Sequence, residues 1–316
     1  MKKNEDLDDL FDFNNSEQKI IKKAKRKSYM RMSSISIFIS IVVMVLAILF
    51  KLQVTPYILS KEMIEKDTYY AVFGANTYLS PWEEQIKVIG SNATATQYKL
   101  LNGQPIFRRE ISLDSSIHET YVQPNKNKSY TYYGQNVMHF YHPKVKYESL
   151  PKDSIKLNDK DINESIEMAI SFDQAYTIEE VQKMLPKEAT LNWYWLDIFN
   201  ENEISSMQNS NQPYAETSAH IFTENQVAGI STFSKTGEKY ENPVKEFMED
   251  VSYGMKNSKE NKDDFTNIFN TLTVNGKLKQ ENIRIIGAVV VGDAHTLTKV
   301  VKEPYTRALS IGATTK

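Results

Sequence analysis

The feature that most constrains this chain is an uncharged, apolar run from Met32 to Phe50, MSSISIFISIVVMVLAILF. As a helix it would be roughly 28 Å long at about 1.5 Å per residue, close to the ~30 Å hydrocarbon thickness of a bilayer. A cleaved signal peptide would begin earlier and end in small residues, whereas Lys51, Leu52 and Gln53 follow this run. A core helix is seldom apolar on every face over such a length. The run therefore predicts a retained transmembrane helix over residues 32–52.

The charges on either side of this helix indicate its orientation. A mixture of acidic and basic residues follows it around 61–67, whereas the residues before it are basic: Lys19, Lys22, Lys23, Lys25, Arg26, Lys27 and Arg31. Because positive residues stay on the cytoplasmic side, we expect a single-pass protein in the cell membrane, with its N-terminus in the cytoplasm and its C-terminus outside. The basic run also predicts contact with the anionic headgroups of the lipid bilayer.

Composition limits what the external region can be. About 260 residues follow the predicted helix, enough for one large domain or two small ones. The chain is 41% hydrophobic and 11% aromatic, which supplies a core and argues against a disordered stalk. It has no cysteine, which favours a bacterial exported domain over a secreted eukaryotic one. The net charge of −2 gives no support to direct nucleic-acid binding.

The segment before the helix, residues 1–31, is too short to bury a core, yet it begins with an apolar stripe in acidic surroundings. In EDLDDLFDF (residues 5–13), helical spacing places Leu7, Leu10 and Phe11 on one face. So short a helix is unstable alone in water and would fold in a partner's groove, one lined with basic residues. A disordered tail is the alternative. The predicted partner-binding residues are Leu7, Asp9, Leu10, Phe11, Asp12 and Phe13.

The region just outside the membrane is predicted to contain a stalk followed by a β-rich lobe. Residues 53–80 form the stalk, with a helix from Pro56 to Phe73. The β-rich lobe covers 81–150, with strand patterns from Ile86 to Leu113 that we expect to be separated by a turn at Gly103-Gln104-Pro105. The charged stretch 144–163 is typical of a linker, so a C-terminal lobe is expected over 151–316.

Two strand–helix–strand units are predicted in the C-terminal lobe. The first has strands at 165–172 and 190–199, with a helix between them that a Thr177–Glu180 capping box begins and Pro186 ends. The second has strands at 283–291 and 305–311 around a helix at 294–302. Helices are expected between the units at 244–256 and 263–272. The predicted fold class is therefore α+β, with one N-terminal transmembrane helix followed by an extracytoplasmic domain of helices against a sheet.

Residues that could carry chemistry are few. Trp193 and Trp195 fall on one face of a predicted strand, where they form either an external ligand platform or part of the core. His139 and His142 would point to opposite faces of a strand, so no metal site is predicted. Gly-x-Ser-x-Gly, P-loop and Ser-x-x-Lys motifs are missing from the sequence. We expect no cofactor and no enzyme activity.

Two stretches carry a family resemblance. SFDQAYTIEEVQKMLP with LNWYWLD (residues 171–197), and IRIIGAVVVGDAHTLTKV with EPYTRALSIGATT (residues 283–315), resemble the C-terminal domain of the bacterial sigma factor regulator family. The acidic and apolar start, the basic run and the membrane helix are similar to the N-terminal part of the same family. Its members are membrane-anchored anti-sigma factors that act on extracytoplasmic-function sigma factors.

The resemblance implies a function. It predicts transcription regulation in which residues 7–13 capture such a sigma factor at the membrane, while the external domain senses cell-envelope stress. A second membrane or envelope protein would be a further partner in this signal transduction. The alternative is a membrane-anchored protein of cell-envelope binding or assembly with no transcriptional role. The two readings differ in whether Leu7–Phe13 has a soluble cytoplasmic partner.

Overall fold

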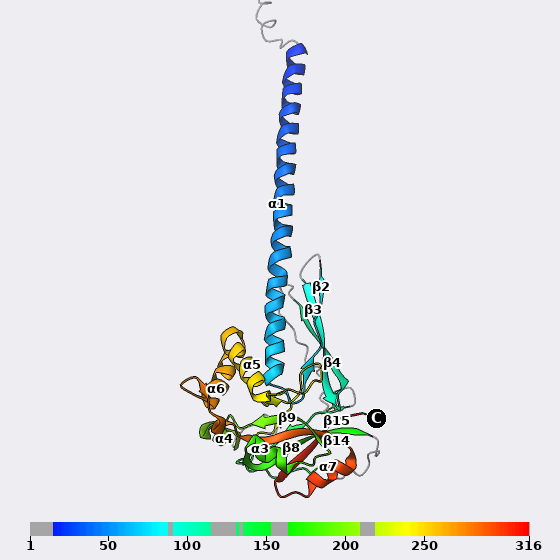
Figure 1. The fold of residues 1–316 in the computed structure, drawn as a ribbon. Helices are drawn as coiled ribbons and strands as arrows, with labels where there is room; N and C mark the ends of the chain where they lie inside the picture. The colour runs from blue at the N-terminus through cyan, green and yellow to red at the C-terminus, as the bar shows by residue number, and fades with distance from the viewer. Residues whose placement is uncertain are drawn as a thin grey trace, which may run out of the picture. The chain divides into compact units, whose positions relative to one another are not determined.

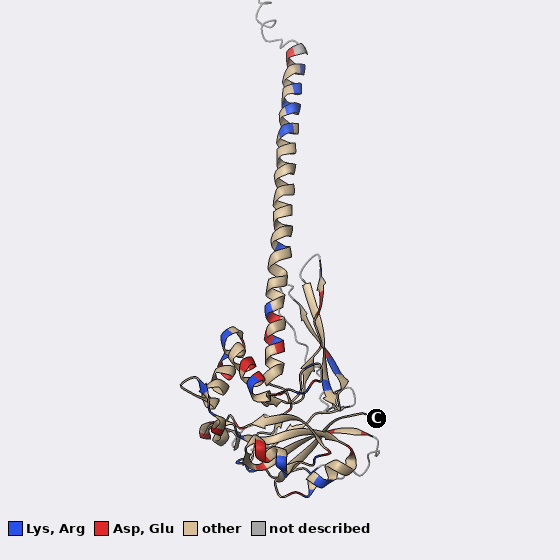
Figure 2. Cartoon of the chain, in the orientation of Figure 1, with Lys and Arg blue, Asp and Glu red and all other residues tan. Residues whose placement is uncertain are grey.

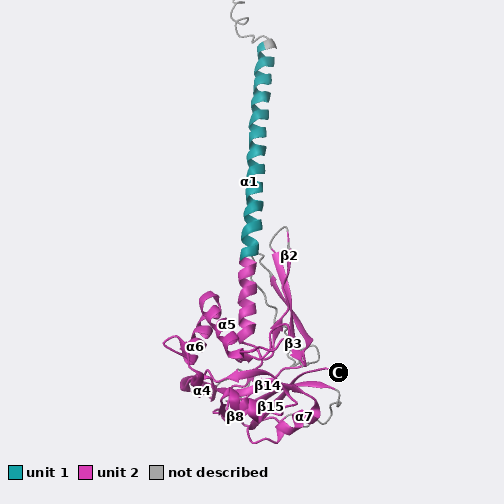
Figure 3. Ribbon diagram, in the orientation of Figure 1, with its two compact units in different colours: residues 1–57 teal, residues 58–316 magenta. Residues whose placement is uncertain are grey.

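The computed structural model describes residues 15–87, 91–114, 131–132, 135–152, 164–208 and 219–315. The chain divides into two compact units, Met1–Tyr57 and Ile58–Lys316, which Figure 3 draws in different colours. One helix, α1 (Asn15–Val72), contributes to both units (Figure 1). The other described helices and all the described strands belong to the second unit, so the chain has the mixed helix and strand class predicted above.

In the first unit, α1 carries the apolar run. Its most apolar 18 residues have a mean hydropathy of 2.8, and α1 is the one helix in the described ranges that is long and apolar enough to cross a membrane. Phe38 is 68% exposed and Ile41 is 51% exposed, which distinguishes α1 from the core helix of a soluble domain. Figure 2 shows basic residues along the start of α1 and then an uncharged stretch. These properties are consistent with membrane anchoring.

The second unit is built on a five-stranded antiparallel sheet. In spatial order its strands are β11 (Gly229–Ser231), β9 (Thr190–Leu196), β14 (Ile285–Gly292), β8 (Ser165–Tyr176) and β15 (Thr306–Thr315). Helix α3 (Ile178–Met184) connects β8 to β9, and helix α7 (Ala294–Val301) connects β14 to β15. Each connection passes over one strand of the other pair, so β8 and β9 run parallel to each other, as do β14 and β15. This interleaving is the split β-α-β arrangement.

Both faces of this sheet are covered, which explains why β14 is buried at every position. On one face, alternate residues such as Ile170 and Val290 pack against α3, α7, α5 (Pro243–Asn257) and α6 (Lys262–Leu272). On the other face, Ala169 and Val289 belong to a second apolar cluster that includes Phe140. Because side chains alternate along a strand, one sequence supplies both cores.

A long hairpin precedes the sheet in sequence. It consists of β3 (Ser91–Leu101) and β4 (Gln104–Asp114), and the short strands β1 (Tyr78–Leu79) and β2 (Glu83–Ile86) also pair with β3. The turn predicted at Gly103-Gln104-Pro105 is wrong by position: Asn102 and Gly103 form it, with φ of 50° and 78°. A two-residue hairpin turn of type I′ requires positive φ at both positions, which Asn-Gly adopts and proline cannot. Pro105 instead lies in β4 opposite Leu100.

Shorter elements complete the unit. They are β5 (Thr131–Tyr132), β6 (Gln135–Asn136), β7 (His139–Phe140), α4 (Glu201–Gln208), β10 (Phe222–Thr223), β12 (Thr273–Val274), β13 (Lys277–Leu278) and the 3-10 turn η1 (Gln280–Asn282). Strands β7 and β10 pair with each other, and Phe140 and Phe222 bring them into the second apolar cluster. These two strands therefore cover the sheet face opposite the helices.

Candidate functional site

The predicted partner-binding residues lie outside the part of the chain that the structure describes. Leu7, Asp9, Leu10, Phe11, Asp12 and Phe13 all precede Asn15, where α1 begins. Docking through this segment therefore stays a prediction. The basic run that follows is described, and its residues from Lys19 to Arg31 are exposed along α1.

The structure places Trp193 and Trp195 in the interior. Their exposed fractions are 1% and 0%, and Phe140 contacts both rings edge-on at centroid distances of 6.0 Å and 5.3 Å. Tyr194 points to the other face of the sheet, where its hydroxyl accepts a hydrogen bond from Gln182 at 3.0 Å. Both indoles are thus packed within the second apolar cluster.

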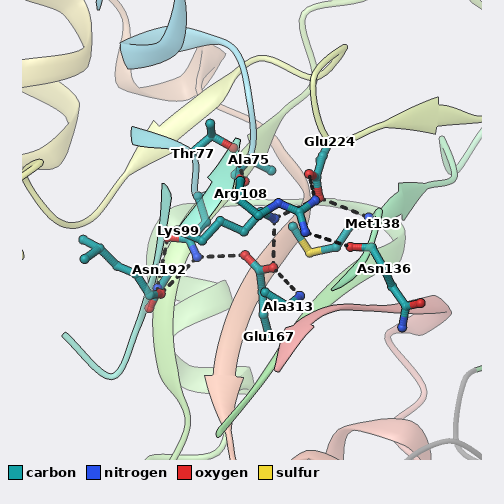
Figure 4. Close-up of polar contacts among 12 residues, drawn as sticks. Ala75, Thr77, Lys99, Arg108, Asn136, Met138, Glu167, Asn192, Glu224 and Ala313 are labelled. Atoms are coloured by element: carbon teal, nitrogen blue, oxygen red, sulfur yellow. Dashed lines mark hydrogen bonds and ion pairs between the residues drawn. The ribbon is translucent and has the colours of Figure 1, made fainter. Parts of the chain in front are cut away.

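Four charged side chains meet inside the second unit, and we call them the buried ion cluster. Lys99 of β3 lies 2.8 Å from a carboxylate oxygen of Glu167 in β8 and 2.8 Å from one of Glu224, which follows β10. Arg108 of β4 lies 2.8 Å from the second oxygen of Glu224. All four are buried, and two positive charges balance two negative ones. Figure 4 shows these side chains converging from three strands and from the turn that follows β10.

Neutral groups satisfy the remaining oxygens of the buried ion cluster. The Asn76 side chain donates to Glu167 Oε1 at 2.8 Å, and the Asn192 side chain donates to Asn76 Oδ1 at 3.1 Å. The backbone N–H of Ala313 donates to Glu167 Oε2 at 2.9 Å, beside an irregularity in the pairing of β15 with β8. A Cβ on Gly312 would lie 2.3 Å from that same oxygen, so only glycine leaves room for this carboxylate.

The electrostatics of the buried ion cluster favour its charged form. Burial alone would raise the pKa of Glu224, but the charges of Lys99 and Arg108 and the hydrogen bonds from Lys99 and the Met138 N–H outweigh burial and lower it. A buried charge needs such compensation because the interior solvates it poorly. The arrangement fastens the β3–β4 hairpin to the central sheet. Sequence reasoning missed it, although one signal was present: Glu167 interrupts the apolar strand residues 166–170.

A second polar site holds the end of α1, and we call it the helix clamp. Glu65 of α1 accepts hydrogen bonds from the Ser258 hydroxyl, from the Lys259 N–H at 3.0 Å and from the Asn261 side chain at 3.2 Å. These donors lie in the connection between α5 and α6. Partial burial would raise the pKa of Glu65, yet the hydrogen bonds prevail and lower it. The helix clamp therefore depends on an ionised carboxylate.

The hairpin contacts the same stretch of α1 from another direction. Leu59 and Met63 of α1 form an apolar cluster with Ala93 and Leu113 of the hairpin. Beyond them, the Trp82 indole N–H donates to Asp67 at 3.0 Å. Residues 58–72 of α1 are thus held both by the connection between α5 and α6 and by the β3–β4 hairpin.

Comparison with known proteins gives one family. Residues 160–313 match the model of a family described as sigma factor regulator C-terminal. The matched range begins just before β8 and ends within β15, so it contains the central sheet and both of its strand connections. This match supports the sigma factor regulator family for this chain. No curated protein and no solved structure matches it.

The two polar sites cross the boundary of the matched range. Glu167 and Glu224 lie inside it, whereas Lys99 and Arg108 come from the hairpin before it. In the helix clamp, Ser258 is inside the range and Glu65 is outside it. Both sites therefore join residues 160–313, which we call the regulator domain, to residues that precede it in the chain.

Proposed function

We propose that this sigma factor regulator is an anti-sigma factor anchored in the cell membrane. Its N-terminal segment is cytoplasmic and captures an extracytoplasmic-function sigma factor, and its second unit lies outside, where it responds to the state of the envelope. The observation that carries the proposal is the presence of a regulator domain and a membrane-length apolar helix in one chain. The basic run before that helix supports the orientation.

Capture at the membrane follows from the chemistry of the N-terminal segment. Leu7, Leu10 and Phe11 would fill a groove on the sigma factor, and the flanking acids would steer the segment towards basic residues around that groove. A sigma factor held this way cannot present the covered surface to polymerase. The helix clamp supplies a physical link by which a change in the external unit can reach α1.

Replacing the apolar anchors tests the docking. Leu10→Ala or Phe11→Ala removes a side chain from the interface, so each should weaken binding by about 2 kcal/mol, a roughly 30-fold loss of affinity. Asp9→Asn and Asp12→Asn are the matched controls, with smaller effects that shrink as salt rises. Titration of the sigma factor with peptides of residues 1–31 measures both.

The cellular test uses the double change Leu10→Ala, Phe11→Ala in the full chain. We expect the sigma factor's target genes to be switched on while the protein remains in the membrane. Unchanged transcription at normal protein levels would refute the docking model. If residues 1–31 also captured no soluble cytoplasmic protein, the alternative of an envelope binding or assembly protein would be preferred.

A further inference from the structure

A cavity of about 640 Å³ lies in the second unit, and none of the four side chains of the buried ion cluster lines it. Residues 64–71 of α1 form one wall, β1 and the loop 231–240 form another, and α5 closes the third side. This volume falls in the range of roughly 300–1,000 Å³ that holds small organic ligands. We call it the tyrosine-lined cavity.

Aromatic rings supply much of the lining of this cavity. They are Tyr70, Tyr78, Phe233, Tyr240, Phe247 and Tyr253. Tyr78 and Phe247 are buried, whereas Tyr253 is 44% exposed, so the rings extend from the interior to the mouth. Aromatic faces carry negative electrostatic potential and attract cations, most strongly where water is excluded.

Charge in the tyrosine-lined cavity is strongly one-sided. Four acidic residues line it, Asp67, Glu238, Glu246 and Asp250, against a single basic residue, Lys235. The acids come from α1, from the loop and from α5, so they face the cavity from three directions. Rings and carboxylates together make a surface that repels anions and favours a positive charge.

The charge of Asp250 is left uncompensated within the described part of the second unit. Burial first, and then the charges of Glu246 and Glu249, raise the pKa of its carboxyl to about 6. Within the described ranges, Asp250 forms no ion pair or hydrogen bond. A partly buried carboxylate without a partner is unfavourable when ionised, and above its pKa a cation in the cavity would relieve that cost.

We propose that the tyrosine-lined cavity binds an organic cation, an ammonium group carried on an apolar or aromatic body. The ammonium group lies against Asp250 and Glu246, and the body packs on Tyr240 and Tyr253. This inference goes beyond the proposed function, because it concerns binding by the second unit and does not require a sigma factor.

Benzyltrimethylammonium is a suitable probe because its charge is permanent and its ring is aromatic. We expect the full chain, in nanodiscs of zwitterionic lipid, to bind it saturably in calorimetry, with a dissociation constant of about 1 mM or tighter. Benzenesulfonate, an aromatic anion of similar size, should not bind. The fluorescence emission of Trp82 gives a second signal, because its indole donates to Asp67 in the cavity wall. Binding of the probe should change this emission, and Trp82→Phe should abolish the change.

Variants locate the site. Asp250→Asn should weaken binding of benzyltrimethylammonium roughly tenfold, the loss expected for one desolvated charge contact. Glu201→Gln is the matched control, because α4 contributes no residue to the cavity, and it should bind as the unaltered chain does. Thermal melting should show that Asp250→Asn is folded, since an amide is less costly to bury than a carboxylate.

The pH dependence gives an independent readout. Affinity should rise as pH increases through about 6, because Asp250 ionises there, and this rise should be missing in Asp250→Asn. Other titratable groups face the cavity: Asp67, Tyr78, Lys235, Glu238, Tyr240 and Glu246, with Glu249 beside them. Burial raises the pKa of Tyr78 and of Tyr240, so neither hydroxyl gains charge between pH 5 and 7. No saturable binding, equal binding of benzenesulfonate, or an unchanged affinity in folded Asp250→Asn would each overturn the proposal.

Discussion

Lys99 illustrates how this fold tolerates charge in its interior. Its ammonium group has two carboxylate partners at 2.8 Å, and its side chain is 0% exposed. The desolvation of buried ions can cancel their attraction, so such a cluster is weak evidence for net stability. Removing one member is different, because the others are left buried and uncompensated. We therefore regard the buried ion cluster as a device that specifies how the hairpin docks on the sheet.

Lys99→Met tests this view. Glu167 would lose its cationic partner and Glu224 would keep only Arg108, so we expect a loss of about 3–5 kcal/mol in unfolding free energy. The measurement is thermal or denaturant unfolding of the full chain, followed by near-ultraviolet circular dichroism. Lys245→Met is the control, because its ion pair with Glu249 is exposed at 64% and 62% and should contribute under about 1 kcal/mol. Equal losses in the two variants would contradict this interpretation.

Asp250→Asn should stabilise the folded chain at neutral pH. The pKa of Asp250 is about 6 in the folded state against an ordinary value of 3.8, so the folded state binds more protons between these values and stability falls as pH rises through them. The Asp250→Asn variant does not lose stability in this way, because its amide does not ionise. We expect its free energy of unfolding to exceed that of the unaltered chain by about 1–3 kcal/mol at pH 7.5, a figure reduced for partial solvent exposure. This difference should disappear near pH 4. Melting curves across this pH range measure the difference.

At the scale of elements, the helix clamp is where α1 meets the regulator domain. Glu65→Gln would weaken the charge-assisted hydrogen bonds from Ser258, Lys259 and Asn261, which should lower the free energy of local opening by about 1–2 kcal/mol. Local opening should appear as faster amide exchange across residues 258–265. Glu281→Gln, on the exposed turn η1, should leave that exchange unchanged.

The helix clamp should also respond to acid. Because the pKa of Glu65 is lowered from its ordinary value of 4.5, its contribution is complete above pH 4.5 and is lost as pH falls through the lower, folded-state value. After correction for the pH dependence of intrinsic exchange, protection of the amides across residues 258–265 should decrease in that acidic range, and the decrease should be smaller in Glu65→Gln. If amide protection in the unaltered chain did not change with pH, the ionised carboxylate of Glu65 would not be what holds the helix clamp together.

Elements with local signals were predicted well. The capping box at Thr177 is confirmed, since its side chain accepts from the Glu180 N–H and Glu180 accepts from the Thr177 N–H. The helices expected at 244–256 and 263–272 are present as α5 and α6, because each has an apolar face at helical spacing. The hairpin turn lies at Asn102-Gly103 and not at Gly103-Gln104-Pro105, because the Asn-Gly pair adopts the positive φ values that the turn requires.

At the scale of the whole molecule, orientation is the decisive prediction. A reporter active only in the cytoplasm should work when fused before Ser28 and fail when fused after Lys316, because the basic residues from Lys19 to Arg31 resist transfer across the membrane. The reverse pattern would place the regulator domain in the cytoplasm. That result would remove the basis for an external sensing domain.

The sequence by itself determined what depends on local order: the apolar run, the basic residues before it, the helix caps and the strand alternation that puts Trp193 and Tyr194 on opposite faces. It also carried the family resemblance that the match over residues 160–313 supports. Only the tertiary structure decided the strand order, the buried ion cluster, the helix clamp and the tyrosine-lined cavity. Lys99 and Glu167 are 68 residues apart, and Glu65 and Ser258 are 193 apart. Pairing over such separations leaves no local periodicity, because it depends on which surfaces come together when the hairpin, the sheet and α1 pack.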